Sequence, residues 1–285
     1  MTINFYLKTY LQVMKTKQIL VALVCAATSL AAYAAKPGVI AHRGYWTPDG
    51  AAENSITSLQ KADSVHVYGS EFDVWMTKDG GLIVYHDTKI NDMEIAESKF
   101  DDIRAQKLCN GENVPTLEEY LTEGKKLRTR LILEIKKHKT PEANIKAAQK
   151  AAKLVKKMGL QDRVEFITFS EPGMMAYKKA SPETDIYYLD GKVLTPAQVA
   201  ERGVTGIDYS YKILKKHPEW IKEAHDLGMK VNVWTCSKPS EIKWCIKQGV
   251  DYITTNEPEL CQALINKMDK KTIESYENKP NIRKK

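Results

Sequence analysis

Short β-rich runs alternate with helical stretches along most of this chain, and no other feature limits its fold as strongly. Such alternation is typical of parallel βαβ units, because consecutive parallel strands are joined by crossover helices. The chain has 285 residues, a length that suits one large α/β domain better than two small domains. We predict an α/β fold, a TIM (β/α)8 barrel, whose eight strands are Val39–His42, Ser70–Val74, Leu131–Ile135, Arg163–Phe169, Asp185–Leu189, Gly206–Tyr209, Lys230–Trp234 and Tyr252–Thr255.

A ninth β-rich run, Leu82–His86, comes directly after the turn signal Lys78-Asp79-Gly80-Gly81. Because such a turn reverses the chain, we expect this run to form a small hairpin insertion after the second strand. Between the barrel strands, Glu142–Met158 and His217–Leu227 are expected to be amphipathic helices. No repeat or low-complexity linker divides the domain.

The N-terminal residues have the pattern of a targeting signal. Three lysines precede the apolar stretch Ile19–Ala32, and residues 1–34 contain no Asp or Glu. The stretch is too short to span a bilayer comfortably, and Ala32-Tyr33-Ala34 supplies the small-x-small pattern that precedes signal cleavage. We therefore predict a signal peptide over residues 1–34, cleavage before Ala35, export to the periplasm or the medium, and no stable membrane span afterwards.

The rest of the chain is divided into a barrel domain over residues 35–269 and a charged, solvated tail over residues 270–285. A lipoprotein anchored at Cys25 is the disfavoured alternative, because Val24 is bulkier than the small residue that usually precedes a lipidated cysteine. Loss of three lysines with the signal peptide would lower the formal charge of +7 by three. No basic block is interleaved with aromatic residues, so we expect no nucleic-acid partner.

Export would expose four cysteines of the barrel domain to a compartment in which disulfides form. Their spacing matches no zinc-binding pattern, and buried free thiols are favoured over a disulfide. The sequence leaves their disulfide status open. The four residues are Cys109, Cys236, Cys245 and Cys261.

Reactive side chains gather at the predicted strand ends, where the active sites of such barrels lie. The first strand ends in His42-Arg43-Gly44, the second carries Glu71 and Asp73, the hairpin ends in His86-Asp87, and the third barrel strand ends in Glu134-Ile135-Lys136. Because side chains alternate along a strand, Glu71 and Asp73 point to the same side, as do Glu134 and Lys136. The spacing therefore predicts one convergent cluster at the barrel mouth.

Three carboxylates that converge in a low-dielectric barrel would repel one another unless a cation lies among them. Glu71, Asp73 and Glu134 offer only oxygen ligands, which favour one divalent cation, Ca²⁺ or Mg²⁺, over softer metals. A structural salt-bridge network with Arg43 and Lys136 is the alternative. It would explain any one of the carboxylates but not the whole set beside two histidines.

Two histidines next to a metal and two fixed cations indicate phosphoryl chemistry. Arg43 can hold a phosphate through its planar guanidinium, and Lys136 can neutralise charge. His42 and His86 suit acid/base catalysis, in which one ring deprotonates the attacking hydroxyl or water and the other protonates the leaving alkoxide. Which histidine is the base stays open.

These residues resemble the glycerophosphodiester phosphodiesterase family, and the resemblance covers nearly all of the chain after residue 34. It implies a TIM barrel that hydrolyses glycerophosphodiesters to glycerol 3-phosphate and an alcohol. It also implies metal ligands at Glu71, Asp73 and Glu134, catalytic histidines at His42 and His86, and phosphate contacts at Arg43 and Lys136. The matching motifs are Ile40-Ala41-His42-Arg43-Gly44, Glu53-Asn54-Ser55, Glu71-Phe72-Asp73-Val74, Thr77-Lys78-Asp79-Gly80, His86-Asp87, Pro115-Thr116-Leu117-Glu118-Glu119, Glu134-Ile135-Lys136, Val231-Asn232-Val233-Trp234-Thr235 and Gly249-Val250-Asp251.

The resemblance suggests further roles and leaves some questions open. Trp234, at the end of the seventh strand, is expected to form an apolar wall against the glycerol carbons, although a lone Trp at such a position also suits the core. Glu53 and Asn54 are expected to brace the first loop by hydrogen bonds, and Asp87 either orients His86 or caps a turn. The attack on phosphorus is made either by the glycerol 2-hydroxyl, through a cyclic phosphate, or by water.

Two departures from the family pattern concern the substrate. Asn256 stands where members usually carry Asp, which removes one negative charge at the last strand end, and the segment Thr88–Val114 is short. The partner is therefore expected to be a small glycerophosphodiester of unspecified headgroup, and the oligomeric state is not determined. The alternatives are a phospholipase-type phosphodiesterase of the phosphoinositide or sphingomyelin class, which should show an exposed apolar rim, and a non-catalytic phosphodiester-binding barrel.

Overall fold

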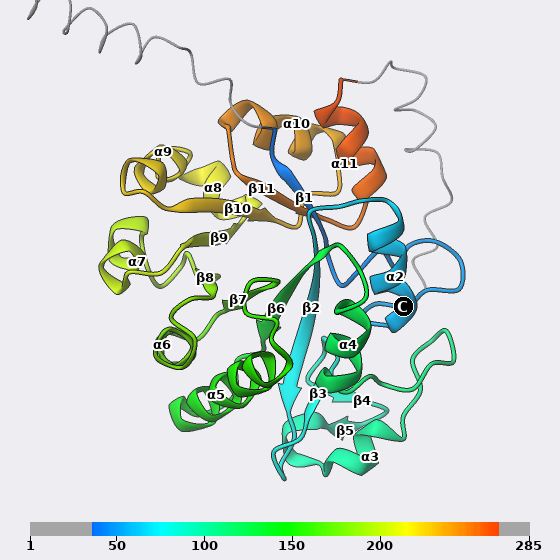
Figure 1. Cartoon of the computed structure of the whole chain (residues 1–285). Helices are drawn as coiled ribbons and strands as arrows, with labels where there is room; N and C mark the ends of the chain where they lie inside the picture. The colour runs from blue at the N-terminus through cyan, green and yellow to red at the C-terminus, as the bar shows by residue number, and fades with distance from the viewer. Residues whose placement is uncertain (1–35, 268–285) are drawn as a thin grey trace, which may run out of the picture. The chain divides into compact units, whose positions relative to one another are not determined.

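The computed structural model describes residues 36–267. Eight parallel strands form a closed sheet, because β1 (Gly38–Ala41) pairs with β2 (Gly69–Met76) on one side and with β11 (Tyr252–Thr255) on the other. This closed sheet confirms the predicted TIM barrel, and Figure 1 shows its strands with the helices around them. The remaining barrel strands are β6 (Arg130–Ile135), β7 (Val164–Thr168), β8 (Asp185–Tyr188), β9 (Gly206–Ser210) and β10 (Lys230–Trp234).

Helices follow the strands and cover the outside of the barrel. Most begin at a Ser or Thr whose side chain accepts a backbone N–H of the first turn; Thr140, for example, starts the helix predicted from its alanine and lysine content. The helices are α2 (Ile56–Ser64), α4 (Leu117–Gly124), α5 (Pro141–Met158), α6 (Glu171–Ala180), α7 (Pro196–Arg202), α8 (Tyr211–Lys216), α9 (Glu219–Asp226), α10 (Pro239–Gln248) and α11 (Pro258–Ile265).

The helix predicted over His217–Leu227 is shorter than expected. His217 has a non-helical backbone, with a φ of −126° and a ψ of 63°, that ends α8, and α9 begins only after Pro218. A proline at this position favours a helix start because it has no backbone N–H to satisfy.

The insertion after β2 is confirmed and is larger than a hairpin. Its first strand, β3 (Leu82–Val84), is antiparallel to β2, and the turn between them contains Gly80 at a φ of +88°. The chain then forms a small core of its own, to which Trp75, Ile83 and Ile95 contribute. The other elements of the insertion are β4 (Lys89–Ile90), β5 (Met93–Glu94), the 3-10 helix η1 (Ile95–Glu97) and α3 (Phe100–Arg104).

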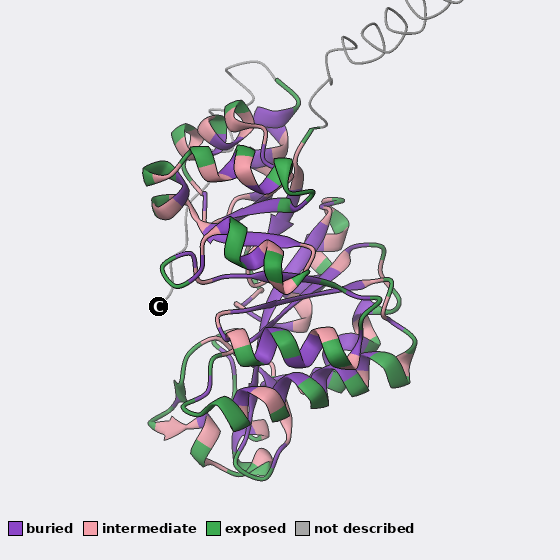
Figure 2. Ribbon diagram, turned by 90° about the vertical axis from the view of Figure 1, so that its left-hand side faces the viewer, coloured by how far each residue is buried: buried purple, intermediate pink, exposed green. Residues whose placement is uncertain are grey.

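The main core lies between the strands and the surrounding helices. Figure 2 shows buried residues along the strands and exposed residues on the outer faces of the helices. A separate apolar layer fills the inside of the barrel and consists of Ile40, Ile132, Ile167, Tyr187 and Leu189. Because this layer closes the barrel interior, the polar side chains at the strand ends lie at one mouth of it.

Some sequence-based expectations fall partly or wholly outside the described residues. The predicted signal peptide over residues 1–34, Cys25 and the predicted tail over residues 270–285 belong to that group. Between residues 36 and 267, no helix is both long and apolar enough to cross a membrane. Of the four cysteines expected to be buried, three are buried, but Cys109 is exposed because it lies in the turn of the insertion before α4.

Candidate active site

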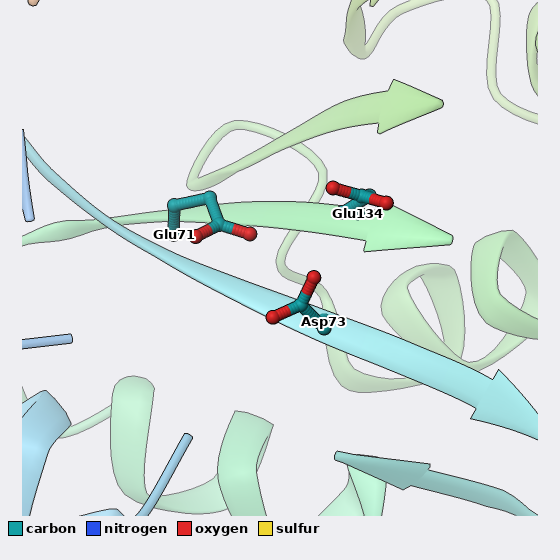
Figure 3. A group of neighbouring side chains, drawn as sticks. All are labelled: Glu71, Asp73 and Glu134. Atoms are coloured by element: carbon teal, nitrogen blue, oxygen red, sulfur yellow. The ribbon is translucent and has the colours of Figure 1, made fainter. Parts of the chain in front are cut away.

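Three carboxylates from two neighbouring strands converge in the barrel. Glu71 and Asp73 lie two residues apart on β2, and Glu134 lies beside Asp73 on β6. One oxygen of each lies within 4.8 Å of the others, and Figure 3 shows the three groups gathered between the two strands. Their exposed fractions are 3%, 1% and 7%. The structure therefore brings together the set that the strand spacing predicted.

Lys136 neutralises part of this cluster. Its ammonium group lies 3.0 Å from Asp73 and 2.9 Å from Glu134. Burial alone would raise the pKa of Asp73, but the charge of Lys136, with smaller contributions from His86 and Arg43, lowers it to about 2. Burial raises the pKa of Glu134 to about 7, although Lys136 opposes that shift. The cluster thus concentrates more negative charge than one lysine offsets.

Glu71 is the least satisfied member of the cluster. Its Oε2 accepts the backbone N–H of Arg43 at 2.8 Å, whereas its buried Oε1 has no hydrogen-bond partner among the described residues. Burial, followed by the charges of Asp73 and Glu134, raises the pKa of Glu71 well above its usual range. A buried carboxylate oxygen without a partner is costly, and a cation shared with the other carboxylates would satisfy it. The residues therefore fit a hard divalent cation with oxygen ligands.

Asn54 holds Asp73 in place. Its side-chain amide donates to Asp73 Oδ2 at 2.9 Å, and its Oδ1 accepts the backbone N–H of Asp73 at 3.0 Å. Asn54 is fully buried and has a φ of 62°, a left-handed conformation that Asn tolerates better than most residues. From the sequence we expected Asn54 to brace the first loop. In the structure its side chain forms hydrogen bonds with Asp73, a candidate metal ligand.

Arg43 and Glu53 connect the first loop to the same cluster. The Arg43 guanidinium contacts Glu53 at 2.6 Å, and its Nε lies 3.7 Å from Asp73 Oδ2. That Nε is buried and makes no hydrogen bond within the described residues. Arg43 therefore retains a donor for a further anionic group beside the carboxylates.

His42 contacts the last strand end through Asn256. The two strands pair in register, with Ala41 opposite Thr255, so the next residues of each strand meet: His42 Nδ1 lies 2.7 Å from Asn256 Oδ1. Burial, followed by the charge of Arg43, lowers the pKa of His42 to about 4. Sequence reasoning treated Asn256 only as a lost charge, although closure of the barrel between its first and last strands could have indicated this contact.

His86 has a different partner. Its Nδ1 lies 2.7 Å from the carboxylate of Asp87. This contact favours a role for Asp87 in orienting the His86 ring over a role in capping a turn. The side chain of His86 is 33% exposed, and that of Asp87 is 71% exposed. Burial lowers the pKa of His86, and the charge of Asp73 opposes that shift. His86 thus lies within electrostatic reach of the carboxylate cluster.

Trp234 ends β10 and is partly buried. Its indole N–H donates to the backbone oxygen of Asp208 at 2.9 Å, and its ring meets Phe169 edge-on at 5.7 Å between centroids. The ring also packs on the apolar layer inside the barrel. These contacts suit a core position, one of the two roles considered for Trp234, and its contact with the glycerol carbons stays a prediction.

Comparison with known proteins gives a consistent result. Residues 42–260 match a model of the glycerophosphoryl diester phosphodiesterase family. The crystal structure of a glycerophosphodiester phosphodiesterase from Parabacteroides distasonis is 44% identical, with a TM-score of 0.80, and the match covers 81% of this chain and 98% of that one.

Two more distant proteins resemble the chain over nearly their whole lengths. A glycerophosphodiester phosphodiesterase of Caldanaerobacter subterraneus is 27% identical over 80% of this chain and 98% of its own length. An Oleispira antarctica phosphodiesterase, whose structure is a complex with the product sn-glycerol-3-phosphate, is 21% identical and shares the fold with a TM-score of 0.71, over 82% of this chain and 98% of that one.

Proposed function

The chain belongs to the glycerophosphoryl diester phosphodiesterase family, and on that premise we propose that it hydrolyses small glycerophosphodiesters to glycerol 3-phosphate and an alcohol with the help of one divalent cation. The single observation that carries the proposal is the buried group of Glu71, Asp73 and Glu134 beside two histidines. The Oleispira antarctica protein of the same fold, with sn-glycerol-3-phosphate as its product, supports the choice of substrate.

Glu71, Asp73 and Glu134 would hold the cation, which is Ca²⁺ or Mg²⁺ because all three offer only oxygen atoms. When bound, the cation would supply charge that polarises the phosphoryl oxygens. Asn54 would keep Asp73 oriented through its two hydrogen bonds. Lys136, already between Asp73 and Glu134, would add positive charge on the same side of the phosphoryl group.

His42 is proposed as the base of the first step. Because Asn256 presents its Oδ1 to the ring at 2.7 Å, His42 Nδ1 carries a proton and Nε2 is left with a free lone pair. Its pKa of about 4 keeps the ring uncharged near neutral pH. Nε2 can therefore accept a proton from the attacking hydroxyl of the glycerol or from water.

His86 is proposed as the acid that protonates the leaving alkoxide. The carboxylate of Asp87, 2.7 Å from its Nδ1, stabilises the protonated ring. Burial lowers the pKa of His86, and Asp73 opposes that shift by favouring the same charged form. In a second step, the opening of a cyclic phosphate or the release of product, the two rings would exchange roles.

Arg43 and Trp234 are proposed to position the substrate. The buried Nε of Arg43 can donate to a phosphoryl oxygen, and Glu53 holds the other end of the guanidinium. Trp234 would contact the glycerol carbons with the exposed part of its ring. These contacts would raise the fraction of bound substrate that is aligned for in-line attack.

The exposed hydrophobic side chains of the described residues do not favour a lipid substrate. Within residues 36–267, the exposed large hydrophobic side chains are Met175, Val193 and Leu227, which come from three separate segments. An enzyme that acts on membrane lipids should present its apolar side chains together. We therefore favour water-soluble glycerophosphodiesters over the phospholipase alternative.

The experiment is a panel of glycerophosphocholine, glycerophosphoethanolamine and glycerophosphoinositol, with release of glycerol 3-phosphate as the readout. We expect turnover of at least one member, loss of turnover in a chelator, and recovery with Ca²⁺ or Mg²⁺; the ion that restores the rate identifies the cofactor. Failure to release glycerol 3-phosphate from any member would overturn the proposed reaction. Undiminished turnover in chelator would overturn the metal requirement.

The N-terminal pattern supports a further proposal, that the protein is exported and acts in the periplasm or the medium. The basic residues, the apolar stretch and Ala32-Tyr33-Ala34 are its basis. N-terminal sequencing of the protein from fractionated cells should give Ala35 as the first residue. A protein that keeps residues 1–34 in the cytosolic fraction would contradict it.

A further inference from the structure

Two buried thiols lie in contact next to the candidate active site. Cys236 follows β10, Cys245 lies on α10, and their Sγ atoms are 3.5 Å apart. Both side chains are fully buried. We propose that Cys236 and Cys245 are a disulfide-forming pair that locks α10 to the loop after β10 when the protein folds under oxidising conditions.

The geometry selects this pair among the cysteines of residues 36–267. The contact between Cys236 and Cys245 is the one sulfur–sulfur hydrogen bond recorded in that part of the chain. A disulfide requires the two sulfurs to approach about 1.5 Å more closely, a change that side-chain rotation and a small shift of the loop can supply. Cys109 is exposed on the insertion, and Cys261 is buried on α11.

The same burial determines when the bond forms. The hydrogen bond to Cys245, together with burial, raises the pKa of Cys236, so the folded protein contains little Cys236 thiolate, and both sulfurs are shielded from an oxidant. Oxidation therefore takes place during folding, or when α10 detaches from the loop, and the folded pair changes its redox state slowly. Once formed, the bond is shielded from reductants by the same packing.

The oxidant is a disulfide, either oxidised glutathione or the disulfide of a thiol oxidoreductase. One cysteine thiolate attacks it, forms a mixed disulfide and releases the first thiolate of the oxidant. The second cysteine then attacks the mixed disulfide and releases the other. The two protein sulfurs together lose two electrons and two protons, and the oxidant gains them as two thiols.

The bond would stabilise the strand end that supports His42. The backbone N–H of Cys236 donates to the oxygen of Thr254, and the side chain of Ser237 accepts the backbone N–H of Asn256. Asn256 in turn contacts His42. A bond from Cys236 to α10 therefore restrains the loop on which this chain of contacts depends.

The test uses the full chain, refolded from denaturant with a mixture of oxidised and reduced glutathione or with dithiothreitol, then alkylated and digested with trypsin. Because Lys243 lies between the two cysteines, they end in separate peptides, Val231–Lys243 and Trp244–Lys247. We expect these peptides to be linked after oxidising refolding, with a mass equal to the sum of the two unalkylated peptides less two hydrogens, and to be separate and alkylated after reduction. Separately alkylated peptides after oxidising refolding, or a link from either cysteine to Cys261, would overturn the proposal.

Variants and melting curves supply the second measurement. The oxidised protein should melt about 5–10 °C above the reduced protein. Cys236→Ala and Cys245→Ala should each remove that difference, and Cys261→Ala, which also removes a buried thiol, should retain both the link and the difference. Equal melting temperatures of the linked and unlinked wild-type protein would overturn the stabilising role.

Discussion

His42 and His86 offer the same imidazole at two places on the barrel mouth, and their partners differ. His42 faces the neutral amide of Asn256, whereas His86 faces the carboxylate of Asp87. A neutral acceptor favours the charged form of a ring only through its hydrogen bond, whereas a carboxylate adds a full opposite charge. The proposed division of acid and base roles between the two histidines rests on this difference in their partners.

The largest expected effect comes from removal of either ring. His42→Ala and His86→Ala should each lower kcat by roughly 10²–10⁴-fold, because each would remove a proton-transfer group. Steady-state release of glycerol 3-phosphate measures the loss.

A third histidine supplies the matched control for those variants. His225 on α9 lies 2.8 Å from Asp251, so it copies the histidine–carboxylate contact of His86 away from the cluster. His225→Ala should leave kcat within about two-fold of the parent, in line with other surface changes. Near-normal kcat in His42→Ala or His86→Ala would show that the ring removed is not a proton-transfer group.

Asn54→Ala should weaken metal binding by about 10–100-fold, because Asn54 orients a ligand without contacting the cation itself. The apparent metal affinity is read from the activity recovered as the cation is titrated into chelator-treated protein. This result separates loss of the metal from loss of a proton-transfer ring, because saturating metal should restore the activity of Asn54→Ala but not that of His42→Ala. A variant that binds metal like the parent would remove Asn54 from the site.

Asn256→Asp should move the acidic limb of kcat/KM to higher pH by about one unit. The new carboxylate would raise the pKa of His42 above its value of about 4, and a base works only when it is unprotonated. The pH profile of the variant measures the shift. An unmoved acidic limb would mean that His42 is not the base.

Asp87→Asn should give the smallest shift of the pH profile of kcat/KM, and this shift should be toward lower pH. Loss of the carboxylate lowers the pKa of His86 further, so the basic limb moves to lower pH, because an acid works only when it is protonated. Asp87 is largely exposed, so solvent and salt screen its charge and keep the shift below that of Asn256→Asp. A shift of the basic limb to higher pH would reverse the roles assigned to the two rings.

Much of the barrel and the carboxylate cluster could be predicted from local patterns. The predicted strands Lys230–Trp234 and Tyr252–Thr255 coincide with β10 and β11. The period of two along a strand placed Glu71 and Asp73 on one face without any knowledge of the fold. Local rules were sufficient because these features depend on residues that are close in the sequence.

Contacts between distant segments could not be predicted in the same way. His42 and Asn256 are 214 residues apart, and their contact depends on the register with which the last strand closes the barrel on the first. The contact of Asn54 with Asp73 depends on the left-handed backbone of Asn54 itself, which has a φ of 62°. The exposure of Cys109 likewise depends on how the insertion folds, since its short elements have weak sequence patterns.

The most direct test of the account measures glycerol 3-phosphate release from chelator-treated protein while Ca²⁺ or Mg²⁺ is titrated back, for the wild type and for Glu71→Gln. We propose that the three buried carboxylates hold the cation on which hydrolysis depends. This proposal predicts a rate near zero without metal, recovery with one cation per chain, and a metal requirement at least about ten-fold higher for Glu71→Gln. Full activity without metal, or identical titration curves for the two proteins, would contradict it.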